Sequence, residues 1–290
     1  MPASNEAVEA VSEILSRVGY GGVAVEEPLE ADSLHVVKAY VPYDHAARVR
    51  VRRVKTALGR LAVFGLAPMG ELEVRPIVER DWLEAWREHY RPLVVGRFLV
   101  KPTWIDVPSD GRLVVELDPG LAFGTGLHPT TQQALQAMSR LDLAGRSVLD
   151  VGTGSGILAL AAIAAGASRV VAVDVDPVAV RAARDNVARA NAARGNPADA
   201  ARGDVDVREG SARDVSGTFD VVLANIVAKV IVTLASELRT RTAPAGTLVV
   251  AGIIQDAEAE TIAALERAGL RVSERDVQGD WVSLILLPLP

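Results

Sequence analysis

Cysteine is absent from this 290-residue chain, which excludes disulfide scaffolds, thiolate zinc sites and cysteine nucleophiles. No uninterrupted apolar run approaches the roughly 20 residues that span a bilayer, and the start of the chain has neither the basic flank nor the apolar core of a signal peptide. Disorder is excluded as well, because hydrophobic residues make up 49% of the sequence. We therefore expect a folded, cytoplasmic protein that makes no membrane contact.

Positive charge is also in short supply. The chain has 31 lysines and arginines against 37 acidic residues, a net charge of -6, which argues against a protein that binds nucleic acid over its whole surface. A helix predicted at about 47–61 is locally basic, and a solvated face explains it more simply than docking to an acidic patch or to ribosomal RNA. We expect a monomer without stable nucleic-acid binding.

Histidine is scarce too, and its spacing is not that of metal ligands. The four histidines are His35, His45, His89 and His128. We therefore expect no metal site.

The first 78 residues predict a small α+β domain. Apolar residues recur at helical spacing over 5–18, and strands are predicted at about 22–27, 34–41 and 71–78. The basic helix lies between the last two of these strands. This order suits two helices packed on one antiparallel sheet.

Residues 79–95 are predicted to form a helical linker between two domains. The segment 81–92 predicts a short helix with Trp82 and Trp86 on one face, and Pro92 marks its end. We expect the two tryptophans to be buried at the domain junction.

From residue 96 to residue 290 the pattern is that of a parallel sheet covered on both faces. Near-continuous apolar runs alternate with helical stretches, as expected for strands that are buried on both sides. These runs lie at 147–151, 169–175, 205–209, 219–225 and 246–252, and a separate strand is predicted before them at 112–117. Two further strands, at 270–276 and 281–287, have no helix between them, so we expect that pair to be antiparallel. The polar stretch 193–204 predicts a mobile surface loop.

A glycine-rich turn marks the candidate binding site. Gly152, Gly154 and Gly156 follow a strand and precede a helix, so the backbone can turn sharply and present the free N–H groups of the helix N-terminus to a ligand. The next strand ends in Asp174, whose carboxylate can accept hydrogen bonds from both hydroxyls of a ribose. The spacing predicts a nucleotide-type ligand, and a tight turn without a ligand is the alternative interpretation.

Two cofactors compete for this turn. An NAD-dependent oxidoreductase is disfavoured because Ile157 stands where the third glycine of the dinucleotide fingerprint would be. Asp150, ahead of the first glycine, suits a site that meets a ligand ammonium. The terminal antiparallel pair after five parallel strands is typical of class I methyltransferases. The fourth strand ends in Asn225, where methyltransferases that modify nitrogen have a polar residue. These features favour S-adenosylmethionine.

Longer motifs carry a resemblance to a known family. The chain resembles the PrmA family, bacterial methyltransferases of large-subunit ribosomal protein eleven, in LDPGLAFGTGLHPTT, VLDVGTGSGILALAA, AVDVDPVAVRAARDNV and VVLANIVA, with DWLEAW and KPTWIDVP upstream. The resemblance runs from about residue 81 to about 254, and the loop motif at 118–131 is highly specific. It implies an α/β protein: a seven-stranded class I methyltransferase (Rossmann-like) domain with a small N-terminal α+β domain that recognises the substrate.

The resemblance also implies the reaction and its residues. Methyl groups pass from S-adenosylmethionine to the α-amine and the lysine ε-amines of that ribosomal protein. The resemblance and the glycine turn together give a set of expected cofactor contacts. The residues after the third strand are included because this fold usually holds adenine there. The expected contacts are Thr131, Asp150, Gly152, Gly154, Gly156, Asp174, Glu209, Gly210, Ser211 and Asn225. Asn225 is also the candidate catalytic residue, because its amide oxygen can accept a hydrogen bond from the amine; a cap of the next helix is the alternative.

An RNA methyltransferase is the alternative function, although no aromatic residue follows Asn225 to stack a flipped base. In the loop motif, His128 is interpreted as a hydrogen-bonding residue of a lid rather than a proton shuttle. Gly120, Gly124 and Gly126 can serve as hinges of that lid, or simply form a tight connection.

The chain departs from the family pattern at its start. Family members usually begin with a strand, whereas the first predicted helix here begins almost at Met1. Either the true start lies upstream of this methionine or the small domain lacks an edge strand.

Overall fold

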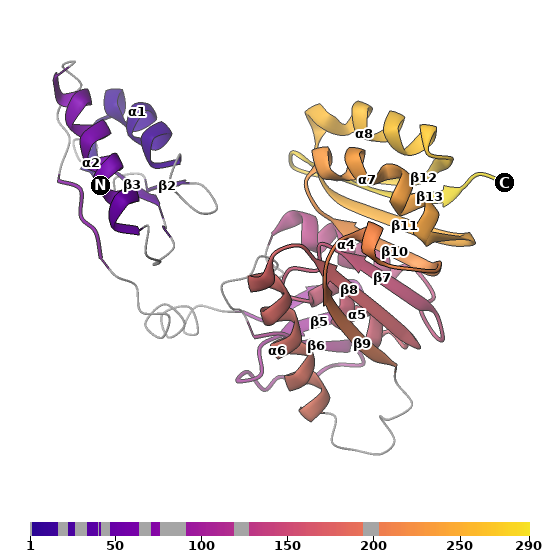
Figure 1. Ribbon diagram of the computed structural model, residues 1–290. Helices are drawn as coiled ribbons and strands as arrows, with labels where there is room; N and C mark the ends of the chain where they lie inside the picture. The colour runs from indigo at the N-terminus through magenta and orange to yellow at the C-terminus, as the bar shows by residue number, and fades with distance from the viewer. Residues whose placement is uncertain are drawn as a thin grey trace. The chain divides into compact units, whose positions relative to one another are not determined.

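The chain forms two compact units, residues 1–88 and 89–290, in the computed structural model shown in Figure 1. Each unit is described by itself. The residues that the structure describes are 2–16, 23–26, 34–39, 41, 47–63, 71–75, 91–118, 128–193 and 203–290.

The first unit packs two helices on a small antiparallel sheet. Its elements are β1 (Pro2–Ala3), α1 (Asn5–Ser16), β2 (Val23–Glu26), β3 (His35–Ala39) and α2 (Ala47–Val63), with strand order β1-β3-β2. The apolar faces of the helices meet in one core, where Val11 and Leu15 of α1 pack with Val54 and Leu58 of α2 and with Val37 of β3. Arg48, Arg52, Arg53 and Lys55 of α2 are exposed, as expected for the faces of the helix outside its apolar stripe.

Two predictions for this unit are wrong. An edge strand does precede α1, since Pro2 and Ala3 pair with Val36 and His35 of β3. Two residues are too few to give a strand pattern in the sequence. Conversely, residues 71–75, the described part of the strand predicted at 71–78, belong to no strand, although they alternate like one. Leu72 packs against the core, but propensity forms no ladder without a neighbouring strand.

The second unit is built on a seven-stranded sheet. Its strands are β7 (Ser147–Val151), β8 (Arg169–Asp174), β9 (Asp204–Glu209), β10 (Phe219–Asn225), β11 (Thr242–Ile254), β12 (Leu270–Gln278) and β13 (Trp281–Pro288). They are ordered β12-β13-β11-β10-β7-β8-β9, and only β13 runs antiparallel to its two neighbours. Five parallel strands and a terminal antiparallel pair confirm the predicted class I methyltransferase fold.

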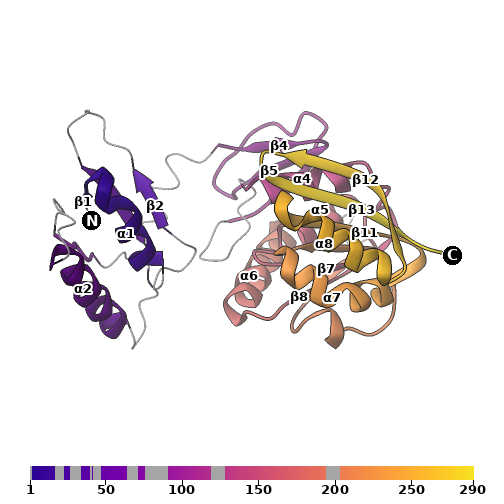
Figure 2. The same ribbon diagram turned by 90° about the horizontal axis from the view of Figure 1, so that it is seen from above.

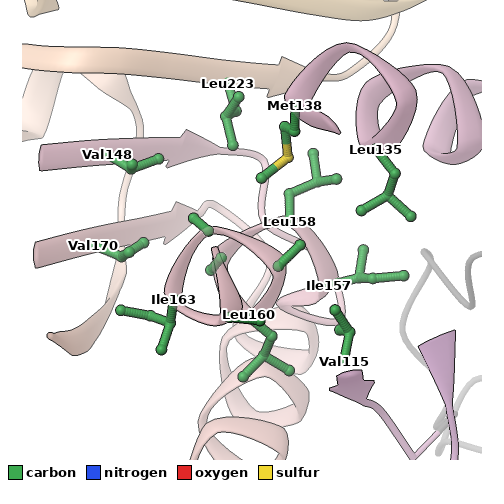
Figure 3. Close-up of a cluster of buried hydrophobic side chains, with 14 of the residues drawn as sticks. Val115, Leu135, Met138, Val148, Ile157, Leu158, Leu160, Ile163, Val170 and Leu223 are labelled. Atoms are coloured by element: carbon green, nitrogen blue, oxygen red, sulfur yellow. The ribbon is translucent and has the colours of Figure 1, made fainter. Parts of the chain in front are cut away.

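Helices cover both faces of this sheet, as Figures 1 and 2 show. One face carries α4 (Pro129–Ser139), α5 (Ile157–Ala164) and α6 (Pro177–Ala193), and the other carries α7 (Ala228–Arg241) and α8 (Gln255–Arg267). Successive side chains of a strand point to opposite faces of the sheet, so Val148 packs toward α5 whereas Leu149 packs toward α7. Figure 3 shows the hydrophobic core between the sheet and the face covered by α4 and α5, where Leu135 and Met138 of α4 face Leu158 of α5.

A second, three-stranded sheet flanks α4 and α5, and the sequence pattern predicts only its third strand. It consists of β4 (Leu93–Val95), β5 (Phe98–Lys101) and β6 (Leu113–Glu116), in that order. The prediction that residues 93–95 belong to a helical linker is wrong. Strands of three or four residues leave little periodic signal, and these form because Phe98 and Val100 bury their side chains in the core beside α4.

Several predictions lie wholly or largely outside the described residues. They concern the helix at 81–92 with Trp82 and Trp86, the glycines of the loop at 118–131, and the mobile loop at 193–204. Among the helices that the structure describes, none is both long and apolar enough to cross a bilayer.

Candidate active site

The predicted site residues gather at one edge of the large sheet. The strand order reverses between β7 and β10, and in open α/β sheets ligands bind beyond the carboxyl ends of the strands at such a point. Asp150 in β7 lies level with Leu223 in β10, and Asp174 at the end of β8 lies level with Glu209 at the end of β9. The register therefore brings together side chains that are up to 94 residues apart in sequence.

The glycine turn after β7 has a backbone that only glycine adopts easily. Gly152, Gly154 and Gly156 have φ angles of 72°, 56° and 86°, in the left-handed region. A Cβ atom on Gly152 would lie 2.2 Å from Cγ2 of Ile226. The N–H groups of Gly152 and Thr153 donate to the carbonyl oxygen of Val173, 2.8 and 3.0 Å away, and Gly156 begins α5. The turn leaves no room for a side chain at Gly152.

Asp174 is held by backbone N–H groups. Its Oδ2 accepts from the N–H of Gly154 at 2.9 Å, and its Oδ1 accepts from the N–H of Asp176 at 3.0 Å. The N–H of Gly210 donates to the carbonyl oxygen of Asp174 at 2.9 Å, so the turn after β9 lies against the end of β8. Each carboxylate oxygen can still accept a second hydrogen bond, as two ribose hydroxyls would require.

Ser211 has a local structural partner. It is the N-cap of a short 3-10 helix (Ala212–Asp214), and its N–H donates to Oδ2 of Asp214 at 2.8 Å while its hydroxyl accepts from the N–H of Arg213 at 3.3 Å. This capping box fixes the turn in which the adenine contact is predicted. A contact of Ser211 with adenine stays a prediction.

Thr131 and Asn225 meet across the site. Thr131 lies buried in the first turn of α4, and Nδ2 of Asn225, at the end of β10, donates to its hydroxyl at 3.3 Å. The alternative that Asn225 caps α7 is wrong, because the N-cap of that helix is Val227 and no side chain bonds there. The amide oxygen of Asn225 accepts no hydrogen bond from the part of the chain that the structure describes. It is therefore available to a donor such as an amine.

His128 begins α4 and fixes its first turn. Its Nδ1 accepts from the N–H of Thr130 at 3.4 Å and lies 2.8 Å from the Thr130 hydroxyl. The imidazole also packs edge-on against Trp281, with ring centroids 5.0 Å apart, and burial lowers its pKa. A neutral ring suits an N-cap acceptor. Trp281, at the start of β13, is a site neighbour that the sequence did not reveal, because only the fold brings β13 to this edge.

Asp150 lies beneath the glycine turn and has no exposed surface. The Thr153 hydroxyl donates to its Oδ2 at 2.6 Å, whereas Oδ1 is buried without a hydrogen-bond partner among the described residues. Burial raises the pKa of Asp150 to about 7, the Thr153 hydroxyl and the Ala159 N–H oppose the rise, and the Asp174 carboxylate adds to it. In this geometry Asp150 acts on the turn through Thr153, and its contact with a ligand ammonium stays a prediction.

The raised pKa of Asp150 makes stability depend on pH. An unfolded aspartate titrates near pH 3.9, so between about pH 4 and 7 the folded chain binds a proton that the unfolded chain has released, and the free energy of unfolding falls as pH rises. Asp150→Asn lacks this contribution. Its free energy of unfolding, relative to the wild type, should rise by about 2–3 kcal/mol between pH 5 and pH 8, measured by urea denaturation.

Asp220 provides the matched control for this measurement. Hydrogen bonds from the backbone and side chain of Ser147 lower its pKa, so its contribution is lost only in acid, below its ordinary titration range. Asp220→Asn should therefore shift the free energy of unfolding equally at pH 5 and pH 8. A constant difference for Asp150→Asn as well would mean that Asp150 is already ionised at pH 5.

No cluster of three metal-binding side chains occurs among the described residues. The polar groups described at the site are backbone amides, two carboxylates, one amide side chain and hydroxyls.

Comparison with known proteins identifies the family. The model of the family "Ribosomal protein L11 methyltransferase (PrmA)" matches residues 1–287. A relative named ribosomal protein L11 methyltransferase from Chloroflexus aurantiacus is 40% identical over 312 residues, covering 97% of this chain and 94% of its own. One of the same name from Pelotomaculum thermopropionicum is 40% identical over 302 residues, covering 96% and 94%.

A solved structure agrees with these relatives. The crystal structure of ribosomal protein L11 methylase from Lactobacillus delbrueckii subsp. bulgaricus has a TM-score of 0.58 and 31% identity, covering 67% of this chain and 96% of its own. These matches confirm the resemblance drawn from the motifs and decide against the oxidoreductase alternative. The chain therefore belongs to the ribosomal protein L11 methyltransferase family, and it is an S-adenosylmethionine-dependent protein methyltransferase.

Proposed function

We propose that this chain methylates ribosomal protein L11 on its α-amine and on lysine ε-amines. The names of the relatives support the substrate. The observation that carries the proposal at the site is the hydrogen bond from Asn225 to Thr131, which holds an amide with a free oxygen acceptor beside the glycine turn. Such an acceptor suits an amine, which has N–H groups to donate and a lone pair to direct.

The residues at the sheet edge fit S-adenosylmethionine, which supplies an electrophilic methyl group on a cationic sulfur. We assign the close backbone approach to Gly152, Gly154 and Gly156, where a Cβ at Gly152 would already collide with Ile226. Asp174 would bind the ribose hydroxyls. Ser211, held against the end of β8 through Gly210, would lie on the adenine side.

Asp150 would act from below the turn. Its unpartnered buried oxygen is the kind of group that a nearby cation stabilises in its ionised form. We assign to Asp150 the positioning of the turn through Thr153 and a favourable electrostatic effect on the cofactor's positive charge. Such an effect does not require direct contact.

The acceptor amine must be neutral and aligned for an in-line displacement. A lysine with a pKa of about 10.4 is neutral in roughly one molecule in a thousand near pH 7.4, which costs about 4 kcal/mol, whereas an α-amine near 7.8 costs less than about 1 kcal/mol. Burial beside a cation lowers the pKa of the lysine amine. The amide oxygen of Asn225 then accepts an N–H bond and turns the lone pair toward the methyl group.

We assign substrate recognition to residues 1–78, because every residue proposed to bind the cofactor lies in the second unit. Residues 79–95 would connect this part to the catalytic domain at 96–290. We propose that the enzyme acts in the cytoplasm, where a ribosomal protein is made, and that it acts as a monomer.

Mass spectrometry tests the function directly. Purified ribosomal protein L11 is incubated with this chain and S-adenosylmethionine, with the Gly152→Arg variant as a blank. We expect the substrate to gain mass in steps of one methyl group, and digestion to locate the additions at the N-terminus and at lysines. If wild-type chain binds the cofactor in calorimetry but leaves the mass unchanged, this substrate is wrong.

A further inference from the structure

A groove of about 230 Å³ lies beside α4. Helix α4 contributes three glutamines to it, while β4 with its following turn and the end of β12 form the two walls. The described lining residues are Val94, Val95, Gly96, Gln132, Gln133, Gln136, Asp276 and Gln278. The groove begins at Gln132, the residue after Thr131, and Thr131 accepts the hydrogen bond from Asn225. The groove therefore lies along the same helix whose first turn contacts Asn225.

Hydrogen bonds fix the β4 wall to the helix. The N–H of Arg97, in the turn after β4, donates to Oγ of Ser139 at 2.9 Å, and its guanidinium donates to the carbonyl oxygen of Leu141 at 2.7 Å. Gly96 lies so close that a Cβ atom there would be 2.2 Å from the Ser139 hydroxyl oxygen. This wall cannot move without breaking buried contacts.

Gln133 fixes the opposite wall. The side chain is only 2% exposed, and its Nε2 donates to the carbonyl oxygens of Trp281 at 3.1 Å and Asp276 at 3.4 Å. Its Oε1 is buried and has no partner among the described residues. Both walls are thus held in place in advance, which lowers the entropic cost of binding.

The chemistry of the groove matches a polypeptide main chain. Glutamine side chains both donate and accept hydrogen bonds, as a peptide group does. Asp276 is the one charged residue among the described lining residues, and none of them is a cation, so the groove does not suit phosphates. The carboxylate of Asp276 favours a neighbouring basic side chain.

The walls also offer strand edges. Among the described strands, β4 and β12 are the outermost of their two sheets, so each has one side without a described partner strand. An extended peptide adds to such an edge through its main chain. Val94 of β4, which lines the groove, is 49% exposed, so apolar surface lies at this rim.

We propose that this groove binds an extended segment of the protein substrate that is next in sequence to the acceptor amine. The exposed side chains of Gln136 and Gln278 and a strand edge bond the main chain, and Asp276 prefers a segment that carries lysine or arginine. The proposal rests on the proposed function in one respect, that the acceptor belongs to a protein and reacts beside Asn225. It explains how amines at different places in one substrate can be presented, because main-chain bonds tolerate different side chains.

Peptide binding tests the groove without turnover. The probe is a fluorescein-labelled decapeptide with the N-terminal sequence of ribosomal protein L11, labelled at its carboxyl end, and its anisotropy is measured with the full-length chain and S-adenosylhomocysteine. The variant Gln136→Ala/Gln278→Ala removes two exposed groove side chains. The loss of about two hydrogen bonds should weaken binding about tenfold. The variant Glu260→Ala/Arg271→Ala, which changes exposed side chains outside the groove, should bind as the wild type does.

Kinetics provide a second measurement. The wild type should methylate the decapeptide with a higher kcat/KM than the tripeptide from the same N-terminus. The groove variant should lose that preference through KM, with the tripeptide rate unchanged. Equal decapeptide binding by wild type and groove variant, or no binding by the wild type, overturns the proposal. The mass of the intact ribosomal protein tests the proposed function separately. If that mass does not change, the proposed function fails, whatever the peptide measurements show.

Discussion

Gly152→Ala should abolish methyl transfer and weaken S-adenosylmethionine binding by at least about a hundredfold, or about 2.7 kcal/mol. The added Cβ would lie 2.2 Å from Cγ2 of Ile226, and the φ of 72° disfavours any side chain. Because Ile226 follows Asn225 directly, the displacement needed to relieve this contact also moves the proposed catalytic amide. Isothermal titration calorimetry measures the cofactor affinity, and mass spectrometry of the substrate measures the transfer.

Gly145→Ala separates the steric contact from the backbone strain. Gly145 has nearly the same φ, 71°, but a Cβ atom added there would have no neighbouring atom within 4 Å, and the residue precedes β7 instead of following it. We expect this variant to lose about 1–2 kcal/mol of stability and to keep its cofactor affinity. If both alanine variants bind the cofactor as the wild type does, the turn does not approach the ligand closely.

Asn225→Ala should lower kcat by about a hundredfold and change the cofactor dissociation constant by less than about threefold. The amide oxygen of Asn225 would act on the acceptor amine, whereas Asp174 and the glycine turn would carry most of the cofactor binding. The measurement pairs steady-state methylation of the ribosomal protein with calorimetric titration of the cofactor. An unchanged kcat would remove Asn225 from the mechanism.

Thr131→Val tests how the amide is oriented. The replacement keeps the buried volume but removes the oxygen that accepts from Nδ2 of Asn225. We expect a fall of about tenfold in kcat, since the amide remains but is no longer held. Combined with Asn225→Ala, the change should cost little more than Asn225→Ala alone, because the two residues act as one unit. Additive losses would show that they act independently.

The class of fold was predictable because its signals are local. Strands buried on both faces read as near-continuous apolar runs, and β7, β8 and β10 were predicted at their observed positions to within a residue. The glycine turn was equally clear, since three left-handed backbone positions in five residues require glycine. Two local features of the sequence are enough to indicate the family: the loop motif that includes Thr131, and the strand that ends at Asn225.

Short elements and partnerless segments were not predictable in the same way. β1, β4 and β5 are two to four residues long and exist because a neighbouring strand completes their ladders. Residues 71–75 show the converse, because a strand-like pattern without a neighbouring strand stays outside any sheet. Secondary structure of this length is decided by contacts between distant segments rather than by propensity.

The sequence by itself determined the parallel sheet and the glycine turn, because periodicity and glycine spacing act within a few residues of one another, and it nominated the candidate site residues. Only the tertiary structure decided that Asn225 bonds Thr131 rather than capping α7, that Asp150 lies buried beneath the turn with a raised pKa, and that Trp281 packs on His128. Those facts depend on the order and register of the strands. Register sets which side chains meet at a sheet edge, and it is fixed by packing across the whole unit.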